Sequence, residues 1–257
     1  MKEKSLTALG QPELSVVILF YRAESLAYEI FSQISNELSD EKIDYELIMV
    51  GNYHSQEEDK TPEILKKLAK NNPRAHVIAK VKKGMMGWDM RSGLKACTGK
   101  YLAIIDGDGQ MILSDVIRVY RIIQLGEYDL VKTFRVKRYD GLYRTFISNV
   151  YNLVFRFLFR PQFLFHDINA KPKIMTREAY EKMDLISNDW FADAEIMIEA
   201  IKNNYRVNEI STIFYKNEQR GSFIAIKDIF EFMKNMIIYR FHNLRANSNA
   251  VDDQGSS

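Results

Sequence analysis

The sequence predicts an α/β fold with a mostly parallel central sheet and helices on both of its faces. Short apolar runs rich in β-branched residues recur along the first half of the chain. Segments with helical spacing separate these runs, and polar loops follow them. Strands that alternate with helices favour parallel pairing, because each crossover helix returns the chain to the same edge of the sheet.

The first half of the chain shows this alternation most clearly. The continuous apolar runs are typical of strands buried on both faces, and they predict strands at Leu14–Tyr21, Tyr45–Val50, His76–Lys80 and Tyr101–Ile105. A Thr-Pro-Glu start at Thr61 favours a helix there. The other helices of this half are predicted at Ser25–Ser39 and at Trp88–Cys97, the second closed by Gly99.

The second half is less regular, and its patterns are shorter. Strands are predicted at Asp129–Arg138 and Val207–Tyr215, and helices at Ile174–Met183 and Ala192–Asn203. The final stretch, Asn247–Ser257, is polar and is expected to be disordered.

The composition is that of a soluble globular protein, with 46% apolar and 27% charged residues among 257. The net charge of +2 gives no basic excess of the kind that nucleic acid binding requires, so a nucleic acid partner is not expected. Cys97 is the single cysteine, which indicates a reducing, cytoplasmic compartment. Met1–Pro12 lacks the apolar core of a signal peptide, and no apolar stretch is long enough to predict a transmembrane helix.

The segment Asp106–Gln110 (DGDGQ) follows a predicted buried strand, where α/β proteins bind ligands. Asp106, Asp108 and Gln110 supply the oxygen ligands that Mg²⁺ or Mn²⁺ prefers, and the intervening glycines allow a sharp turn. An ordinary acidic turn is the alternative. The residues after Gln110 lack the pattern of an EF-hand, and the first strand is not followed by the glycines of a dinucleotide-binding loop.

Further motifs, taken with this one, resemble the family 2 glycosyltransferases with the GT-A fold. The resemblance is closest to their polyprenyl-phosphate branch, the dolichol-phosphate mannose synthase type. Besides the metal motif, it is carried by Ser15–Glu24, Arg138-Tyr139-Asp140-Gly141 with Arg144, Asp167–Lys173 (DINAKPK), Asp189–Glu195 (DWFADAE) and Arg220-Gly221-Ser222. It implies a glycosyltransferase domain over residues 13–222, after an N-terminal tail of residues 1–12 and before a C-terminal amphipathic helix at residues 223–246 and a tail at residues 247–257.

The resemblance also implies a site for a UDP- or GDP-sugar donor. Its expected members are Leu19, Tyr21, Glu24, Asn52, Asp106 and Gly107. Leu19 stands where the family usually has proline. The second strand, which in the family usually ends in Asp-Asp-Gly-Ser, here ends in Gly51-Asn52-Tyr53-His54, so the acidic residue that contacts the base is replaced. Asn52 would meet a base as a neutral amide.

The resemblance implies catalytic roles for Asp193, Glu195, Arg138 and Arg220, and acceptor or phosphate contacts for Arg144, Lys171 and Ser222. Lys173 is a further basic candidate. A hydroxyl acceptor requires a general base, for which Asp193 is the first candidate and Glu195 the second. A phosphate acceptor is largely a dianion at neutral pH and attacks without a strong base. Inversion at the sugar carbon is implied by the resemblance.

Two segments have the composition of interfacial helices. Phe146–Phe165 is aromatic and apolar but is interrupted by Arg156 and Arg160, and Ile224–Leu244 carries a second apolar series. Such helices lie in the lipid headgroup layer, with their basic residues at phosphates. Replacing Arg156 and Arg160 is therefore expected to weaken binding to anionic vesicles. The alternative is that both helices cover the core or join copies of the chain in a homo-oligomer.

The leading hypothesis is a metal-dependent transferase that acts on polyprenyl phosphate, peripherally at the cytoplasmic face of the membrane. One alternative keeps the fold and metal site but uses a saccharide or another soluble acceptor. A second alternative is a non-catalytic nucleotide-binding protein of transferase ancestry, which the change at Asn52 would suit.

Overall fold

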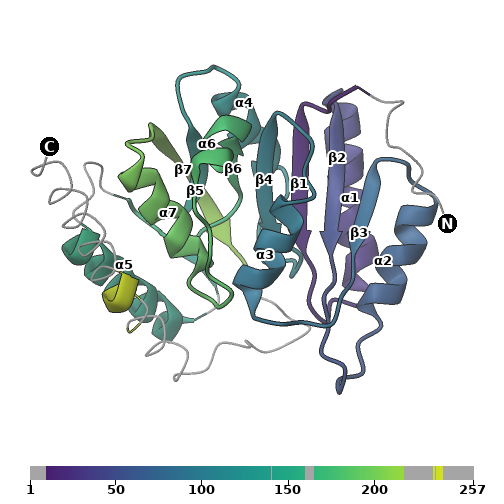
Figure 1. The fold of residues 1–257 in the computed structure, drawn as a ribbon, viewed down its shortest axis with the longest axis horizontal. Helices are drawn as coiled ribbons and strands as arrows, with labels where there is room; N and C mark the ends of the chain where they lie inside the picture. The colour runs from purple at the N-terminus through teal and green to yellow at the C-terminus, as the bar shows by residue number, and fades with distance from the viewer. Residues whose placement is uncertain (1–9, 140, 160–164, 217–233, 235, 240–257) are drawn as a thin grey trace, which may run out of the picture.

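The computed structural model describes residues 10–139, 141–159, 165–216, 234 and 236–239. This part of the chain contains one seven-stranded sheet, in the order β3-β2-β1-β4-β6-β5-β7 (Figure 1). Its elements are β1 (Leu14–Leu19), α1 (Leu26–Asp40), β2 (Tyr45–Val50), α2 (Thr61–Lys70), β3 (Ala75–Ile78), α3 (Met86–Leu94), β4 (Tyr101–Asp106), α4 (Asp115–Ile123), β5 (Leu130–Arg138), α5 (Leu142–Phe159), β6 (Lys173–Thr176), α6 (Arg177–Lys182), α7 (Ala192–Lys202) and β7 (Val207–Phe214).

The direction of the strands decides which residues meet. The first four strands are parallel to one another, and β5 is parallel to β7. β6 is antiparallel to both of its neighbours, β4 and β5. The start of β6 therefore lies at the same edge of the sheet as the ends of β4 and β5, and we call this edge the C-terminal edge.

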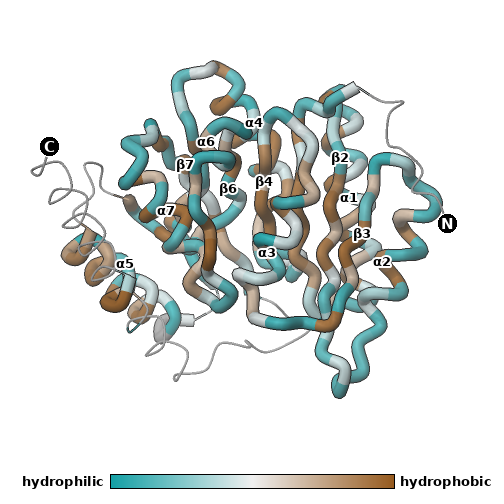
Figure 2. Tube along the Cα trace, viewed as in Figure 1, coloured by the Kyte–Doolittle hydropathy of each residue, from teal (hydrophilic) through white to brown (hydrophobic). Residues whose placement is uncertain are grey.

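The sheet is buried on both faces, as the continuous apolar runs predict. In β1, Val16 and Ile18 belong to a core that includes residues of α1, α2 and α4. Val17, between them, belongs to a second core that includes residues of α3, α5, α6 and α7. Side chains alternate between the faces of a strand, so only an uninterrupted apolar run fills both cores. Figure 2 shows these strands as the apolar centre of the molecule.

The strand predictions are confirmed, as are the predicted helices at α1, α2, α3 and α7. The prediction of a helix at Ile174–Met183 is wrong in its first part, because residues 173–176 form β6 and the helix begins only at Arg177. Ile174 is buried in one core and Met175 in the other, which is the alternation of a strand. The helix α4 was not predicted.

The expected aromatic helix is present as α5, and residues 160–164 of that prediction lie outside the described part of the chain. No helix among the described residues is both long enough and apolar enough to cross a membrane. Most of residues 223–246 and the tails also lie outside the described part, although Met236 is buried in the second core. The domain limits proposed from the sequence stay a prediction.

Candidate active site

Asp106 is the last residue of β4 and is paired in register with Leu19 at the end of β1. The next residue, Gly107, donates its N–H to the Leu19 carbonyl at 2.9 Å. A Cβ atom at Gly107 would lie 2.4 Å from the ring of Phe20, so the chain needs glycine here. The half-exposed Asp106 carboxylate is thereby fixed at the C-terminal edge, with 30% of its side chain accessible.

The turn after β4 presents the other two expected metal ligands. Asp108 accepts the backbone N–H of Gln110 at 3.0 Å, across Gly109, which has a positive φ of 73°. The Gln110 side chain donates to the carbonyl of Tyr215 at 2.9 Å, and the Tyr215 N–H returns a bond to the Gln110 carbonyl at 2.8 Å. The turn is therefore attached to the end of β7.

These residues fit a divalent cation that is shared with a ligand. Asp106 and Asp108 are half-exposed and offer hard oxygen atoms, as Mg²⁺ and Mn²⁺ require, whereas Gln110 behind them is buried. Among the described residues, however, no group of three His, Cys, Asp or Glu side chains is arranged to hold a metal by itself. A cation at this turn would thus need further oxygen atoms, and a diphosphate supplies them.

A chain of alternating charges runs inward from Asp106. The ammonium group of Lys171 lies 3.2 Å from Asp106 Oδ2 and 2.7 Å from Asp193 Oδ2. The other oxygen of Asp193 accepts a bond from Lys173. Lys171, Lys173 and Asp193 are all buried. The topology explains the cluster, because Lys173 begins the antiparallel β6, Lys171 lies two residues before it, and Asp193 lies in the first turn of α7.

Burial and charge act in opposite directions on these groups. Burial alone would raise the pKa of Asp193, but the attraction of Lys171 and Lys173 outweighs it, and the pKa lies below its usual value. Burial lowers the pKa of Lys173 to about 8 despite its bond to Asp193. Burial also acts against the ammonium of Lys171, yet two carboxylates hold its pKa above the usual value. Asp193 is therefore a carboxylate in contact with two ammonium groups.

Glu195 faces away from this cluster, although it stands only two residues from Asp193. Its carboxylate accepts the backbone N–H groups of Ile186 and Ser187 at 3.0 Å each. Burial raises its pKa to about 7. These contacts hold the segment that leads into α7, and they do not bring Glu195 to the C-terminal edge with Asp106.

The expected donor residues after β1 and β2 differ in exposure. Glu24 is exposed, and Tyr21 is half-buried with its hydroxyl donating to Glu57 at 2.8 Å. Asn52 is only 1% exposed. Its amide nitrogen donates to Asp89 at 2.8 Å, and its amide oxygen accepts the Lys80 N–H at 2.9 Å. Both ends of the Asn52 amide thus have partners inside the protein, and its contact with a base stays a prediction.

The basic candidates Arg138 and Arg144 lie where β5 passes into α5. Arg138 ends β5, with its guanidinium 5.5 Å from the ring centre of Phe214, and Arg144 is half-buried in the first turn of α5. Asp167 of the DINAKPK motif forms a two-bond ion pair with Arg135. Arg220 and Ser222 lie outside the described residues.

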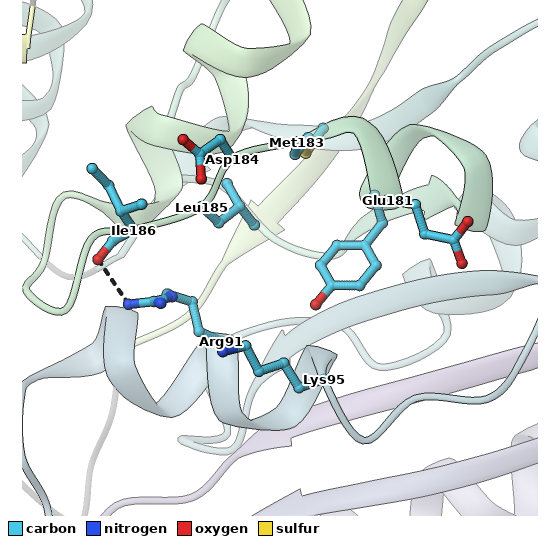
Figure 3. A pocket seen from close by; sticks show the side chains of 8 residues that line it. Arg91, Lys95, Glu181, Met183, Asp184, Leu185 and Ile186 are labelled. Atoms are coloured by element: carbon cyan, nitrogen blue, oxygen red, sulfur yellow. Dashed lines mark hydrogen bonds between the residues drawn. The ribbon is translucent and has the colours of Figure 1, made fainter.

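A separate surface pocket of about 350 Å³ lies between α3, α6 and residues 183–186 (Figure 3). Arg91 of α3 crosses it and donates to the Ile186 carbonyl at 2.7 Å. The pocket contains none of the residues predicted for the site. Its contacts, like those of Glu195, hold the segment before α7.

The comparison with protein families decides the identity of the fold. The family model described as "Glycosyl transferase family 2" matches residues 15–184, which is more than half of the chain. The chain belongs to glycosyl transferase family 2. The sheet with helices on both faces is the GT-A fold, and the protein is a nucleotide-sugar-dependent glycosyltransferase.

Solved structures of similar fold include two synthases of phosphoglycerate sugars. Glucosyl-3-phosphoglycerate synthase from Mycobacterium tuberculosis, in complex with Mn²⁺, UDP and phosphoglyceric acid, matches with a TM-score of 0.68 and 15% identity, over 89% of this chain and 78% of that one. Mannosyl-3-phosphoglycerate synthase from Rubrobacter xylanophilus matches with 0.67 and 15%, over 92% and 75%. A mannosyltransferase from Pyrobaculum calidifontis, in complex with GDP-Man and Mn²⁺, matches with 0.57 and 16%, over 82% and 59%.

Some buried charged residues of this glycosyltransferase are not predicted from the sequence. Lys82 and Asp89 form a buried ion pair beside Asn52. Lys132 is fully buried and bonds to Glu209 at 2.8 Å, beneath the DINAKPK segment. No local pattern marks Lys132, because Arg135, Lys137 and Arg138 are basic residues of the same strand. No local pattern marks Asp89, because its partners are 7 and 37 residues away.

Proposed function

We propose that this glycosyltransferase moves a sugar from a nucleoside-diphosphate sugar to a polyprenyl phosphate, with a divalent cation and with inversion at the sugar carbon. We place the reaction at the cytoplasmic face of a membrane. The observation that carries the proposal is that both oxygens of Asp193 accept bonds from buried ammonium groups. A carboxylate held in this way is poorly placed to take a proton, so the acceptor should arrive already ionised.

The donor side of the proposal rests on the turn after β4. Asp106, Asp108 and Gln110 would hold Mg²⁺ or Mn²⁺ together with the oxygens of the donor diphosphate. The cation, when bound, offsets the negative charge that develops on the leaving diphosphate. Lys171 fixes one oxygen of Asp106 at 3.2 Å and leaves the accessible part of the carboxylate for the ligand.

The acceptor side follows from the charges around Asp193. A hydroxyl acceptor must lose a proton to a base, whereas a phosphate monoester has a second pKa near 6 and is largely a dianion at neutral pH. Lys171 and Lys173 keep Asp193 ionised and oriented, which makes it a positioning residue in this scheme. Arg138 and Arg144 are candidates for holding the acceptor phosphate, because both lie where β5 passes into α5.

The helix α5 supports a lipid as the body of the acceptor. Phe146, Val150, Leu153 and Phe157 are spaced by four, three and four residues, which places them on one face of the helix. They are 66%, 38%, 65% and 73% exposed. The opposite face packs into the protein through buried residues such as Phe155. An exposed apolar stripe beside basic residues is typical of a helix that lies at a membrane surface.

The basic contact expected at Arg156 needs revision within this proposal. Its guanidinium donates two bonds to the Phe165 carbonyl, at 2.9 and 2.6 Å, and so serves the protein itself. Arg160 lies outside the described residues. We therefore assign the lipid contact to the apolar stripe of α5.

A soluble, phosphate-bearing acceptor is the second candidate, because two of the similar structures are synthases of phosphoglycerate sugars. Phosphoglyceric acid also offers a hydroxyl as nucleophile, so the two acceptors differ both in the apolar chain and in the group that can attack the sugar. Transfer from UDP- and GDP-sugars with Mn²⁺ should therefore be measured to a short polyprenyl phosphate and to phosphoglyceric acid. We expect product with the polyprenyl phosphate alone, and transfer to phosphoglyceric acid alone would overturn the proposal.

The role of α5 has its own test with a matched control. Leu153→Ser removes the centre of the stripe, and Leu125→Ser removes a similarly exposed leucine just past the end of α4, 65% and 68% exposed respectively. We expect Leu153→Ser, but not Leu125→Ser, to weaken sedimentation with anionic vesicles by about threefold or more. Equal binding by both variants would contradict the membrane assignment. A change of oligomeric state in Leu153→Ser alone would assign the stripe to an interface between copies of the chain.

A further inference from the structure

The carboxylate that is missing after β2 is present one hydrogen bond away. Position 52 carries an amide, and its nitrogen lies 2.8 Å from Oδ1 of Asp89, in the first turn of α3. Asn52 also approaches Ser92 at 3.3 Å. A negative charge thus lies at the end of β2 although it comes from a different element.

The position of this carboxylate suits the base of a nucleotide. Val50, Leu19 and Asp106 lie side by side at the ends of β2, β1 and β4. Adjacent strands are about 4.8 Å apart, so the end of β2 lies roughly 10 Å from the metal turn. A donor whose diphosphate binds at Asp106 and Asp108 would extend its nucleoside along this edge.

An aromatic and a basic side chain complete the surroundings of Asp89. Lys82 pairs with Asp89, and its ammonium also lies 4.6 Å from the ring centre of Tyr21. The ring of His54 meets Tyr21 edge-on at 6.2 Å. Tyr21 and His54 are half-buried, whereas the side chains of Lys82 and Asp89 are only 5% and 9% exposed. The cluster is therefore a buried ion pair of Lys82 and Asp89 beside the half-buried rings of Tyr21 and His54.

We propose that Asp89 and Lys82 read the base of the sugar donor, in place of an acidic residue at position 52. The inference rests on the proposed nucleotide-sugar donor. A carboxylate accepts hydrogen bonds and an ammonium donates them, so the pair complements a base edge on which an N–H stands beside a carbonyl. Uracil and guanine present that edge, and adenine and cytosine do not. Tyr21 supplies a ring on which any base can stack, so it adds affinity without selectivity.

The selectivity test uses four nucleotides and two variants. UDP, GDP, ADP and CDP are titrated with Mn²⁺ into the wild type, into Asp89→Asn and into the exchange variant Asn52→Asp/Asp89→Asn. The exchange variant keeps one carboxylate and one amide at the same two positions, so the charge of the cluster is unchanged. We expect the wild type to bind UDP or GDP at least about tenfold more tightly than ADP and CDP. Asp89→Asn should reduce that ratio to within about threefold, and the exchange variant should recover part of it.

The outcomes separate this inference from the function on which it rests. An unchanged ratio between nucleotides in Asp89→Asn overturns the assignment while the donor site stands. If Asp89→Asn does not fold, an exchange variant that folds and still ranks the four nucleotides as the wild type does supports the assignment. An exchange variant that folds but shows no ranking overturns it. Failure of the wild type to bind any of the four with Mn²⁺ overturns both the inference and the proposed donor.

Discussion

Asp106 and Asp193 belong to one chain of charges, and the difference between their surroundings separates their roles. Lys171 contacts both carboxylates, at 3.2 and 2.7 Å. Asp106 remains 30% exposed at the end of a strand, whereas 4% of the Asp193 side chain is exposed and both of its oxygens face ammonium groups. The accessible carboxylate suits ligand binding. The buried Asp193 carboxylate instead pairs with Lys171 and Lys173 and fixes their positions.

The largest effect that tests this difference is expected on stability, from Asp193→Asn. Removing the charge leaves Lys171 and Lys173 buried with no anion between them, which costs about 3–5 kcal/mol of unfolding free energy. Urea denaturation measures it. The control is Glu178→Gln, which breaks an exposed pair with Lys182 of the same 2.7 Å length and should cost less than about 1 kcal/mol. Similar losses in both variants would contradict an enclosed role for Asp193.

Donor binding is the corresponding test of the accessible carboxylates. Asp108→Ala should weaken Mn²⁺-dependent binding of the nucleotide by at least about 100-fold, because the cation loses a ligand and the diphosphate loses its bridge. Calorimetry with Mn²⁺ and with EDTA measures the change, and Asp40→Ala, at the exposed end of α1, is the control. The variant should stay folded, because Asp108 is half-exposed, with a loss of about 1 kcal/mol from its bond to the Gln110 N–H. Unchanged nucleotide affinity in the presence of Mn²⁺ would show that the cation does not bind at this turn.

The strands that position Asp106 could be predicted from the sequence. The buried cluster of Lys171, Lys173 and Asp193 could not. The run at Leu14–Tyr21 predicts a doubly buried strand, and the strand before Asp106 predicts where that carboxylate lies. Pairing between Lys171 and Asp193 depends on β6 entering antiparallel between β4 and β5. The spacing of Ile174–Met183 instead favoured a helix, and nothing local in it indicates which strands flank it.

A second enclosed carboxylate would sharpen the comparison, and Asn52→Asp creates one. The new side chain would lie within hydrogen-bonding distance of Asp89, which already shares the ammonium of Lys82. Two carboxylates with one cation must share a proton or repel each other. We expect a loss of about 1–3 kcal/mol in unfolding free energy at pH 8 and a smaller loss at pH 5, where one carboxylate is protonated. A loss independent of pH would mean that packing, not charge, is responsible.

Glu195 shows what enclosure does when no ammonium is adjacent. Burial raises its pKa from 4.5 to about 7, so the folded state holds a proton that the unfolded state has lost between these values. The stabilisation from this group is complete below about pH 4.5 and is lost as the pH rises to about 7. Relative to Glu195→Gln, the wild type should lose up to about 3 kcal/mol of unfolding free energy between pH 4.5 and 8. A difference that stays constant over this range would contradict the raised pKa.

The most direct test of the account compares a polyprenyl phosphate with the alcohol of the same chain. The two acceptors share the lipid and differ only in whether the nucleophile arrives ionised. With Mn²⁺ and the donor identified by calorimetry, we predict transfer to the phosphate and none to the alcohol across pH 6.5–7.5, where both lysines are ammonium groups and Asp193 is not free to take a proton. Comparable transfer to the alcohol would show that a general base operates at this site, and it would contradict the role assigned to Asp193.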